Sequence, residues 1–333
     1  MFSSLTPRKT SESDMRTTRT LSRWARAGLA STLLFAVGVI AAHAESLVPG
    51  TGQKLEQVGD DFEDEGWDYL FNSPKSTRDI DEQDRLPAGE AKNGRWYEGM
   101  KRGQPDVVKR VPTPEGGLPG SRGAVLLQSL WTGIPGQPRN YLGQDDFIAD
   151  VNYRLQGAIP AARSPSVVVR VFLPPVDTWE NRTGPHFGFR MALETAAVKP
   201  QPGLQFSRSR AETEAYWPGM FIEFQSKTRE GENDYAYLRI RGNGNGEDFR
   251  SKQITTTGWW TLGMSVTVDG MVHYYASPGV DDLTQADYLG SQYPYGFRAE
   301  SFRTFFFNVC NADDGRNWST AWIIDDPGVY VAR

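Results

Sequence analysis

The strongest constraint on the fold is a series of short segments rich in β-branched and aromatic residues, spread over residues 124–326. Glycine, proline, asparagine or aspartate usually separates one segment from the next, which is the pattern of β-strands joined by turns. No stretch has the period of an amphipathic helix, so the sequence predicts an all-β domain built as a sandwich. The segments are AVLLQSL, FIADVNYRL, SVVVRVFL, HFGFRMALE, MFIEFQSK, YAYLRIRG, WWTLGMSVTV, MVHYYAS, RTFFFNVC and AWIIDD.

The clearest local element is a hairpin in TLGMSVTVDGMVHYYAS. Asp269 and Gly270 stand between two alternating runs, and an Asp-Gly pair in that position favours a type I′ turn. The 34 glycines, 21 prolines and 12% aromatic residues agree with a chain of many turns and packed strands.

Alternation within the strands assigns their side chains to two faces. In HFGFRMAL, Phe187 and Phe189 fall on one face, and His186 and Arg190 fall on the other. The same rule selects the polar-face residues of the other strands, which are Arg170, Glu223, Gln225, Tyr237, Arg239, His273 and Tyr275.

Residues 1–44 have the pattern of an export leader. A basic stretch, PRKTSESDMRTTRTLSRWARA, precedes the apolar GLASTLLFAVGVIAA, and AHA then supplies small residues before Glu45. This predicts a secretory signal peptide and a protein that is periplasmic, on the cell surface or extracellular. An uncleaved N-terminal anchor is the alternative, although the apolar run is shorter than a membrane span of about 20 residues.

The charge of the chain argues against a nucleic-acid partner. The chain has 36 basic and 41 acidic residues, and the leader holds six and two of these, which leaves 30 and 39 and a net charge of −9. An acidic protein offers no general basic surface for a polyanion. A membrane partner is expected only if the leader stays attached.

After the leader, the sequence predicts a linker over residues 45–57 and one sandwich domain over 58–333. A polar insertion at about 68–123 interrupts this domain and shows neither a helical nor a strand period. Because the insertion is too long for one connecting loop, we expect it to pack on the domain as extended segments, with Trp96 and Tyr97 as anchors.

The opening DDFED…W, the Asp-Gly hairpin and the closing AWIIDDPGVYV resemble the concanavalin A-like lectin/glucanase superfamily. The resemblance implies a jelly-roll β-sandwich of two curved antiparallel sheets, with sugar bound on the concave sheet and the first and last strands side by side. It would also explain why both ends carry acidic pairs, since several members bind calcium.

A calcium ion is therefore a candidate cofactor. Neighbouring carboxylates repel unless a cation or basic residues lie between them, and calcium prefers several carboxylate oxygens. Solvated carboxylates or arginine pairing are the alternatives. The candidate ligands are Asp60, Asp61, Glu63, Asp325 and Asp326.

The superfamily's hydrolases carry Glu-x-Asp-x-x-Glu on one strand, and this signature is absent here. EQDRLP and ENDYAY begin the pattern but end in Pro87 and Tyr237. We therefore expect a non-catalytic glycan-binding or envelope-associated protein, with a purely structural surface protein as an alternative. Aromatic platforms and planar polar groups recognise sugars, which selects Arg170, His186, Glu223, Gln225, Tyr237, Trp179, Trp217 and Tyr293.

A polysaccharide lyase acting on a uronate-containing polymer is the enzymatic alternative. Such an enzyme neutralises the uronate carboxylate and moves a proton with a tyrosine or histidine. Arg190 or Arg239 would bind the carboxylate and His273 or Tyr275 would move the proton, if these strands share one sheet. Together with Arg170, the arginines would form a locally basic cleft. The other interpretation is an Arg/Glu/Tyr ladder that stabilises a solvated sheet face.

Overall fold

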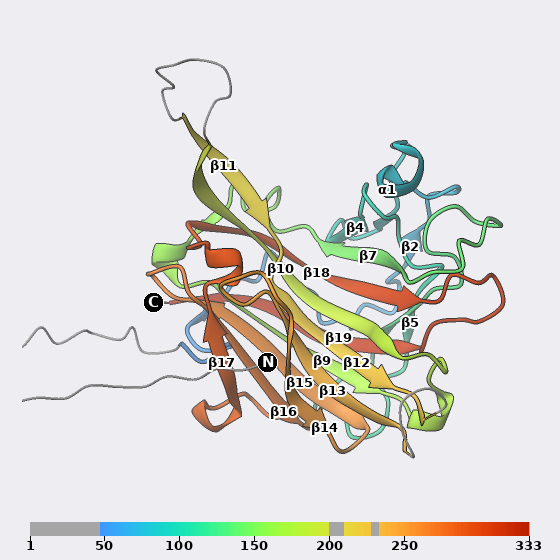
Figure 1. The fold of residues 1–333 in the computed structure, drawn as a ribbon. Coiled ribbons are helices and arrows are strands. Elements are labelled where there is room, and N and C mark those ends of the chain that lie inside the picture. Colours follow the sequence, from blue (N-terminus) through green and yellow to red (C-terminus); the bar gives the residue numbers. More distant parts are fainter. Residues whose placement is uncertain (1–46, 200–209, 228–232, 333) are drawn as a thin grey trace, which may run out of the picture. The chain divides into compact units, whose positions relative to one another are not determined.

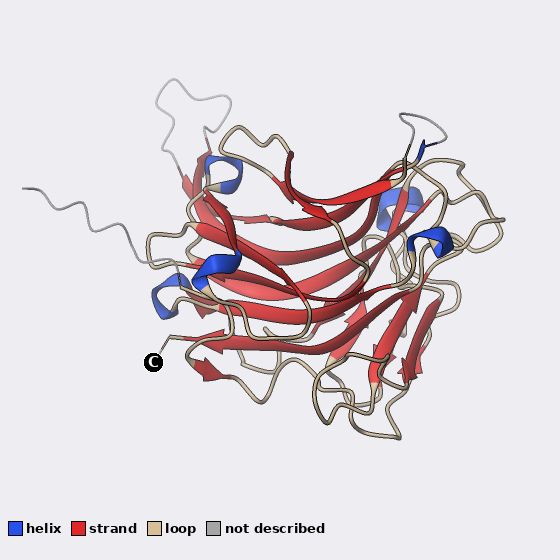
Figure 2. Cartoon of the chain, turned by 90° about the horizontal axis from the view of Figure 1, so that it is seen from below, coloured by secondary structure: helices blue, strands red, loops and turns tan. Residues whose placement is uncertain are grey.

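The computed structural model describes residues 47–199, 210–227 and 233–332, so the predicted leader at 1–44 lies outside the described residues. Within these ranges, nearly all regular structure is strand, arranged in two antiparallel sheets (Figures 1 and 2). The predicted all-β jelly-roll sandwich is confirmed. In this part of the chain, the helices are too short or too polar to cross a bilayer.

The small sheet contains eight strands in the described part of the chain. Its order is β17-β16-β15-β9-β19-β6-β5, and β1 pairs with β19. The strands are β1 (Gln53–Lys54), β5 (Val107–Val111), β6 (Ala124–Gln128), β9 (Ser166–Leu173), β15 (Gly258–Val266), β16 (Val272–Pro278), β17 (Tyr288–Gln292) and β19 (Trp322–Val331).

The large sheet contains eleven strands among the described residues. Its order is β14-β13-β12-β10-β18-β7-β4-β3-β2, with β11 beside β10 and β8 beside β18. The long strand β10 pairs with β12 in its first half and with β11 in its second half. The strands are β2 (Tyr69–Leu70), β3 (Glu90–Ala91), β4 (Trp96–Glu98), β7 (Gly143–Ala149), β8 (Ile159–Pro160), β10 (Gly184–Lys199), β11 (Arg210–Tyr216), β12 (Gly219–Gln225), β13 (Tyr235–Arg241), β14 (Phe249–Ile254) and β18 (Ser301–Asn311).

Helices are short in the described residues. They comprise α1 (Arg78–Asp81) and the 3-10 turns η1 (Ala161–Arg163), η2 (Val176–Thr178), η3 (Gln285–Asp287) and η4 (Pro294–Gly296).

The core lies between the two sheets and is rich in aromatic rings. Phe187 and Phe189 of β10 are fully buried, as the alternation predicted. Phe187 meets Trp322 of β19 with ring centroids 5.3 Å apart, which joins the large sheet to the small one. Each fully buried side chain of this size contributes roughly 1.5–3 kcal/mol, so this aromatic layer holds the sandwich together.

The polar insertion contains strands that its sequence pattern did not indicate. Strands β2–β4 extend the large sheet beyond β7, and β5 pairs with β6 in the small sheet. Most of these strands have only two or three residues, which is too short for a period to be recognised. Trp96 is buried and stacks on Phe147 at 4.5 Å, whereas Tyr97 is partly exposed on the opposite face of β4.

The two ends of the domain are neighbours, as the sequence predicted. The Asp60 amide donates to the Pro327 carbonyl at 3.1 Å. Gln53, which lies in the predicted linker at 45–57, pairs with Val331, so part of that linker is a strand of the small sheet. The register of β19 against β9 shifts between Asp325 and Gly328, and Asp326 has a φ of 42°. The acidic pair therefore forms a bulge within the last strand rather than ending it.

The predicted Asp-Gly hairpin is confirmed, but its turn is not type I′. Thr267 donates to the Met271 carbonyl, which leaves a three-residue loop, and Gly270 has a φ of 79° while Asp269 has no positive φ. A type I′ turn needs a positive φ at both central residues. The Asp269 carboxylate instead accepts a hydrogen bond from the Thr267 hydroxyl at 2.6 Å, which fixes the longer loop.

Candidate functional site

A cleft of about 760 Å³ opens on the outer face of the large sheet. Strands β7, β18 and β10 contribute its floor. Residues 99–102, which follow β4, form one wall, and β11 forms the other together with Tyr295 of η4 and Phe297 after it. The residues that give the cleft its chemistry are Tyr97, Lys101, Arg102, Asp146, Arg190, Glu214, Trp217, Arg241, Arg303 and Phe306.

Strand register places the floor residues in rows that cross the sheet. The first row runs from β4 to β13 and contains Tyr97, Ile148, Phe306, Arg190, Gly219 and Arg241. Adjacent strands lie about 4.8 Å apart, so the five intervals between these six residues span about 24 Å. The second row, on the same face, contains Asp146, Asn308, Gly188, Phe221 and Arg239.

Arg190 is fixed at the centre of the floor. Its Nε and Nη2 donate to the Trp217 carbonyl at 3.1 and 2.6 Å, and its guanidinium lies 5.2 Å from the Phe306 ring centroid. A Cβ at Gly219 would lie 2.5 Å from Arg190 Cγ, so glycine makes room for this side chain. Burial, followed by the nearby Arg241, lowers the pKa of Arg190 to about 9, and the side chain remains charged at neutral pH.

Asp146 places a carboxyl group beside this arginine. Asn308 donates to its Oδ1 at 2.5 Å, and Arg102 Nη1 lies 3.7 Å from the same atom. Burial raises the pKa of Asp146, although Arg102 and Arg190 oppose that rise. Asp146 is therefore a carboxyl group on the cleft floor that holds its proton to higher pH than a solvated aspartate does.

Aromatic rings line the rim and floor of the cleft. The Trp217 side chain is 43% exposed, and Tyr97 is partly exposed. Burial raises the pKa of Tyr97 to about 12, and burial also raises the pKa of Tyr216. These tyrosines therefore keep their protons at neutral pH, which makes them hydrogen-bond donors rather than bases.

The lining is basic although the chain is acidic. The lining contains five cationic side chains, Lys101, Arg102, Arg190, Arg241 and Arg303, and two acidic ones, Asp146 and Glu214. Outside the lining, Asp79 pairs with Lys101 and Arg102, and Glu194 pairs with Arg303, so part of this positive charge is balanced. The whole chain has a net charge of −5. Low-dielectric walls concentrate the field of such a cluster, which makes the cleft attractive to anions.

Four of the predicted residues lie together on the same face, farther along β12 and β13. The Tyr237 hydroxyl donates to Glu223 Oε1, Arg239 Nη1 lies 2.5 Å from Glu223 Oε2, and Gln225 Nε2 lies 3.5 Å from the Tyr237 hydroxyl. Arg239 also pairs with Asp248 at 2.7 Å. The cluster is a cross-strand ladder of the kind that the sequence offered as an alternative. Its members Glu223, Gln225 and Tyr237 are buried rather than solvated, and Gln225 Oε1 has no hydrogen-bond partner among the described residues.

The predicted lyase residues do not converge on one sheet. Arg190 and Arg239 belong to the large sheet, whereas His273 and Tyr275 lie on β16 of the small sheet. Arg170 lies on β9 of the small sheet and pairs with Asp282 at 2.8 Å. Alternation assigned faces within each strand but did not reveal which strands share a sheet, so the proposed four-residue centre and the three-arginine cleft are wrong.

Three further predicted sugar contacts lie elsewhere. Trp179 is buried against Trp322, with ring centroids 5.1 Å apart. His186 is fully buried between the Thr320 hydroxyl and the Arg182 carbonyl. The Tyr293 hydroxyl donates to Asp269 at 2.7 Å beside the hairpin of the small sheet. The sequence places five aromatic residues in or near loops as candidate sugar platforms: Trp179, Tyr216, Trp217, Tyr293 and Tyr295. Of these, Tyr216, Trp217 and Tyr295 line the cleft.

The predicted calcium ligands have protein partners. Asp60 accepts from the Trp67 and Trp96 indoles at 3.0 and 3.1 Å, Glu63 accepts from the Arg122 and Gly123 amides, and Asp61 Oδ1 accepts from the Glu63 amide. Asp326 pairs with Lys54 and Arg170, and Asp325 accepts from Ser121. Across the described ranges, no group of three or more acidic, histidine or cysteine side chains is arranged to hold a metal ion.

Sequence reasoning missed most of the basic wall. Lys101 and Arg102 follow β4 in a turn with no periodic pattern, so nothing marked them. Phe306 and Asn308 could have been found, because alternation in RTFFFNVC places them opposite the buried Phe305 and Phe307.

No protein-family model matches the chain, and neither does any curated protein. Several solved structures are similar. A protein of unknown function from Shewanella oneidensis MR-1 is 12% identical, over 80% of this chain and 85% of that one, with a TM-score of 0.34. A GH131 β-glucanase catalytic domain from Podospora anserina is 9% identical, over 72% and 86%, with a TM-score of 0.40. An endo-β-1,4-glucuronan lyase from Trichoderma reesei is 11% identical, over 71% and 94%, with a TM-score of 0.33. At these values the similarity says nothing about the activity of this chain.

Proposed function

We propose that the protein binds an acidic glycan in the cleft of the large sheet. The observation that supports this is the coincidence, in one cleft, of five cationic side chains with exposed aromatic rings. Guanidinium groups pair with carboxylate or sulfate in two-pronged geometry, and an aromatic ring packs on the apolar face of a sugar. A neutral glycan would form no ion pairs with the cationic side chains of the cleft, and a compact anion would not contact the aromatic rings at its rim.

The pre-organisation of the cleft also supports binding. Arg190 is held by the Trp217 carbonyl and two phenylalanine rings, so little side-chain entropy is lost when a ligand arrives. Trp217 lies next to this contact on the rim, where it can lie against a sugar ring. The cation and the platform thus come from one local arrangement.

The test measures binding of the folded full chain to alginate, pectate and a neutral glucan by calorimetry at low and high salt. Acidic polymers should bind, the glucan should bind far more weakly, and added salt should weaken the acidic complexes because it screens the cleft. Trp217→Ala and Arg241→Gln should each weaken binding about 5- to 30-fold, as central aromatic and arginine contacts do.

Two matched substitutions serve as controls. Trp318 is 44% exposed, close to the 43% of Trp217, but does not line the cleft. Arg298 is an exposed arginine beside Tyr293, and it does not line the cleft. Trp318→Ala and Arg298→Gln should bind like the wild type. Equal affinity for acidic and neutral polymers, or no binding to any of them, would refute the proposal.

A uronate lyase is the second candidate, and the observation that favours it is Asp146. Its carboxyl group lies on a basic floor and has a raised pKa, so it is suited to exchange a proton near a bound uronate. The cleft tyrosines keep their protons and are poor bases. Elimination would create an ultraviolet-absorbing double bond, so steady growth of that absorbance, abolished in Asp146→Asn, would establish the enzyme. A flat trace from a protein that binds the polymer would exclude it for that polymer.

A further inference from the structure

A second hollow, of about 300 Å³, adjoins the cleft. Lys101 and Arg102 line both hollows. Gln144 lines the second hollow and Asp146 lines the cleft, and residues two apart on a strand share one face and lie about 7 Å apart. The two hollows are therefore neighbours along β7, with the two basic side chains at their junction.

The second hollow has an exposed aromatic wall whose position is fixed. Tyr141 is 58% exposed, and Arg139 donates to its hydroxyl at 3.1 Å while the guanidinium lies 4.6 Å from the ring centroid. Arg139 is itself anchored by the buried Asp313 at 2.6 Å and by the Thr132 hydroxyl at 2.8 Å. A ring held in this way binds a flat apolar surface with little further loss of side-chain entropy.

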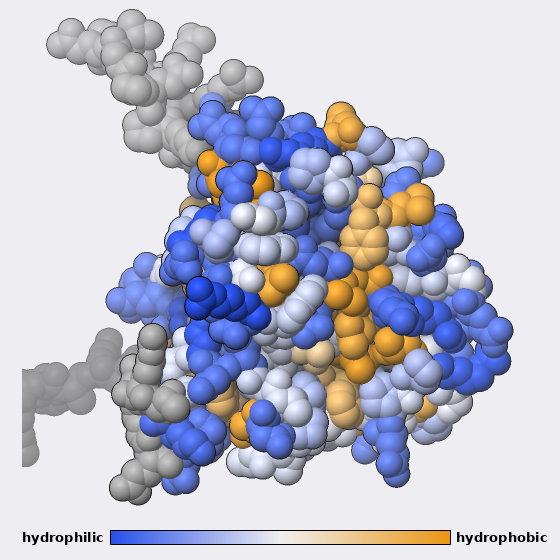
Figure 3. All heavy atoms as spheres, turned by 90° about the vertical axis from the view of Figure 1, so that its right-hand side faces the viewer, coloured by the Kyte–Doolittle hydropathy of each residue, from blue (hydrophilic) through white to orange (hydrophobic). Residues whose placement is uncertain are grey.

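This side of the molecule also has other exposed apolar groups. Figure 3 shows the side that lies at the right in Figure 1, near α1, β2 and β4, and hydrophobic side chains gather there in a band among hydrophilic ones. Leu142, next to Tyr141, is 39% exposed and lines the same hollow. The hollow therefore combines apolar and cationic surface, as the main cleft does.

We propose that this hollow is a second subsite for the same acidic glycan, so that the natural ligand is an extended polymer segment rather than a short sugar. The inference rests on the proposed function. The Tyr141 ring would pack on the apolar face of one sugar unit, while Lys101 and Arg102 contact an acidic group at the junction. Asp79 lies 3.4 Å from Lys101 and 3.2 Å from Arg102, so it balances part of this charge and keeps both side chains at the junction.

The experiment measures the affinity of the full chain for oligogalacturonates and oligomannuronates of two to ten units. For the wild type, affinity should keep rising beyond the length that fills the main cleft. Tyr141→Ala should bind the longest oligomers about tenfold more weakly, which corresponds to about 1.4 kcal/mol, and bind the shortest ones normally. Tyr141→Phe keeps the ring and should retain most of the affinity at every length.

Two comparison variants separate the subsites. Tyr153 is 83% exposed and lies away from both hollows, so Tyr153→Ala should match the wild type at all lengths. Trp217→Ala should weaken binding at all lengths because it alters the main cleft. If Tyr141→Ala binds the longest oligomers as tightly as the wild type while Trp217→Ala is impaired, the second subsite is refuted and the proposed function stands. If the folded wild type binds no oligomer and no polymer, the proposed function itself fails.

Discussion

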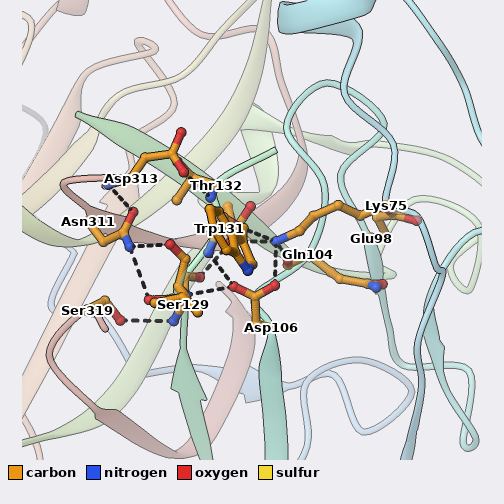
Figure 4. Close-up of polar contacts among 12 residues, drawn as sticks. Lys75, Glu98, Gln104, Asp106, Ser129, Trp131, Thr132, Asn311, Asp313 and Ser319 are labelled. Carbon is orange, nitrogen blue, oxygen red and sulfur yellow. Dashed lines mark hydrogen bonds and ion pairs between the residues drawn. The ribbon is translucent and has the colours of Figure 1, made fainter. Parts of the chain in front are cut away.

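Replacing Lys75 with methionine should destabilise the fold by about 4 kcal/mol at pH 7. The Lys75 side chain is only 2% exposed, and its ammonium lies 3.0 Å from Asp145 Oδ2 and 3.1 Å from Asp106 Oδ1. It also donates to the carbonyls of Gln104 and Trp131. Figure 4 shows this ammonium directed between Asp106, Gln104 and Trp131.

The magnitude follows from what the substitution leaves behind. Removing one partner of a buried ion pair costs about 3–5 kcal/mol, because the remaining charge keeps its desolvation penalty. The Gln104 and Trp131 carbonyls also lose a donor, at roughly 1 kcal/mol each. Methionine recovers part of this through its apolar surface, and protonation of Asp145 recovers another part, since burial already raises the pKa of that carboxyl group.

Urea unfolding followed by tryptophan fluorescence measures the effect. Lys92→Met is the control, because Lys92 pairs with Asp68 at 2.6 Å but both side chains are about half exposed, and such surface pairs contribute 0–1 kcal/mol. Lys75→Met combined with Asp145→Asn should be more stable than Lys75→Met alone. The deficit of Lys75→Met should also shrink as the pH falls, because protonation removes the unpaired charge. A Lys75→Met protein within 1 kcal/mol of the wild type, or a double variant no more stable than the single one, would contradict this reasoning.

Two further predictions concern pH. Burial raises the pKa of Asp325 to about 6, above its ordinary 3.8, so its contribution to stability is present below pH 3.8 and is lost as the pH rises to 6. At pH 7, Asp325→Asn should therefore have a free energy of unfolding up to about 3 kcal/mol larger than the wild type, seen as a higher urea midpoint. Below pH 4 the two proteins should be equally stable. Burial lowers the pKa of His186 to about 3, below its ordinary 6.5, so its contribution is present above pH 6.5 and is lost as the pH falls toward 3. Between pH 6.5 and about 3, the free energy of unfolding of His186→Gln should fall less steeply with decreasing pH than that of the wild type, by about 1.4 kcal/mol per pH unit. An equal slope in both proteins would show that His186 is protonated in the native state.

Strand alternation predicted the fold well because it reports burial directly. Phe187 and Phe189 lie in the core as expected, and SVVVRVFL coincides with β9. The pairing of the chain ends was also predicted, from acidic pairs at both ends together with the family resemblance. The strand faces depend on a two-residue period that is visible in the sequence, whereas the pairing of the ends is a long-range contact that only the resemblance implied.

The candidate site was harder to predict because it depends on which strands share a sheet. His273 and Arg190 each lie on the polar face of a strand, but strand order places them in different sheets. Arg102 reaches the cleft from a turn, and no period marks a turn residue that faces a neighbouring strand. Trp217 was found because proline and glycine follow it in AYWPG, which indicates a loop, and loops are where binding residues concentrate.

The cleft depends on the segment whose pattern was least informative. The turn that contains Lys101 and Arg102 is held by the Asp146 amide, which donates to the Gly103 carbonyl at 3.0 Å. A Cβ at Gly103 would lie 2.5 Å from Lys75 Cδ, so this turn packs directly on the buried lysine. Asp145 and Asp146 are consecutive residues of β7, and they direct one carboxyl group to Lys75 and the next to the cleft.

The buried ion pair and the basic wall are thus joined through one strand. Lys75→Met should therefore weaken acidic-glycan binding as well as stability, since loss of the ion pair lets the wall shift. Trp217→Ala should weaken binding while leaving the free energy of unfolding nearly unchanged, because its side chain is exposed at the rim. Measuring both quantities for both variants tests the link. A folded Lys75→Met protein with wild-type affinity would show that the wall keeps its position without the buried pair.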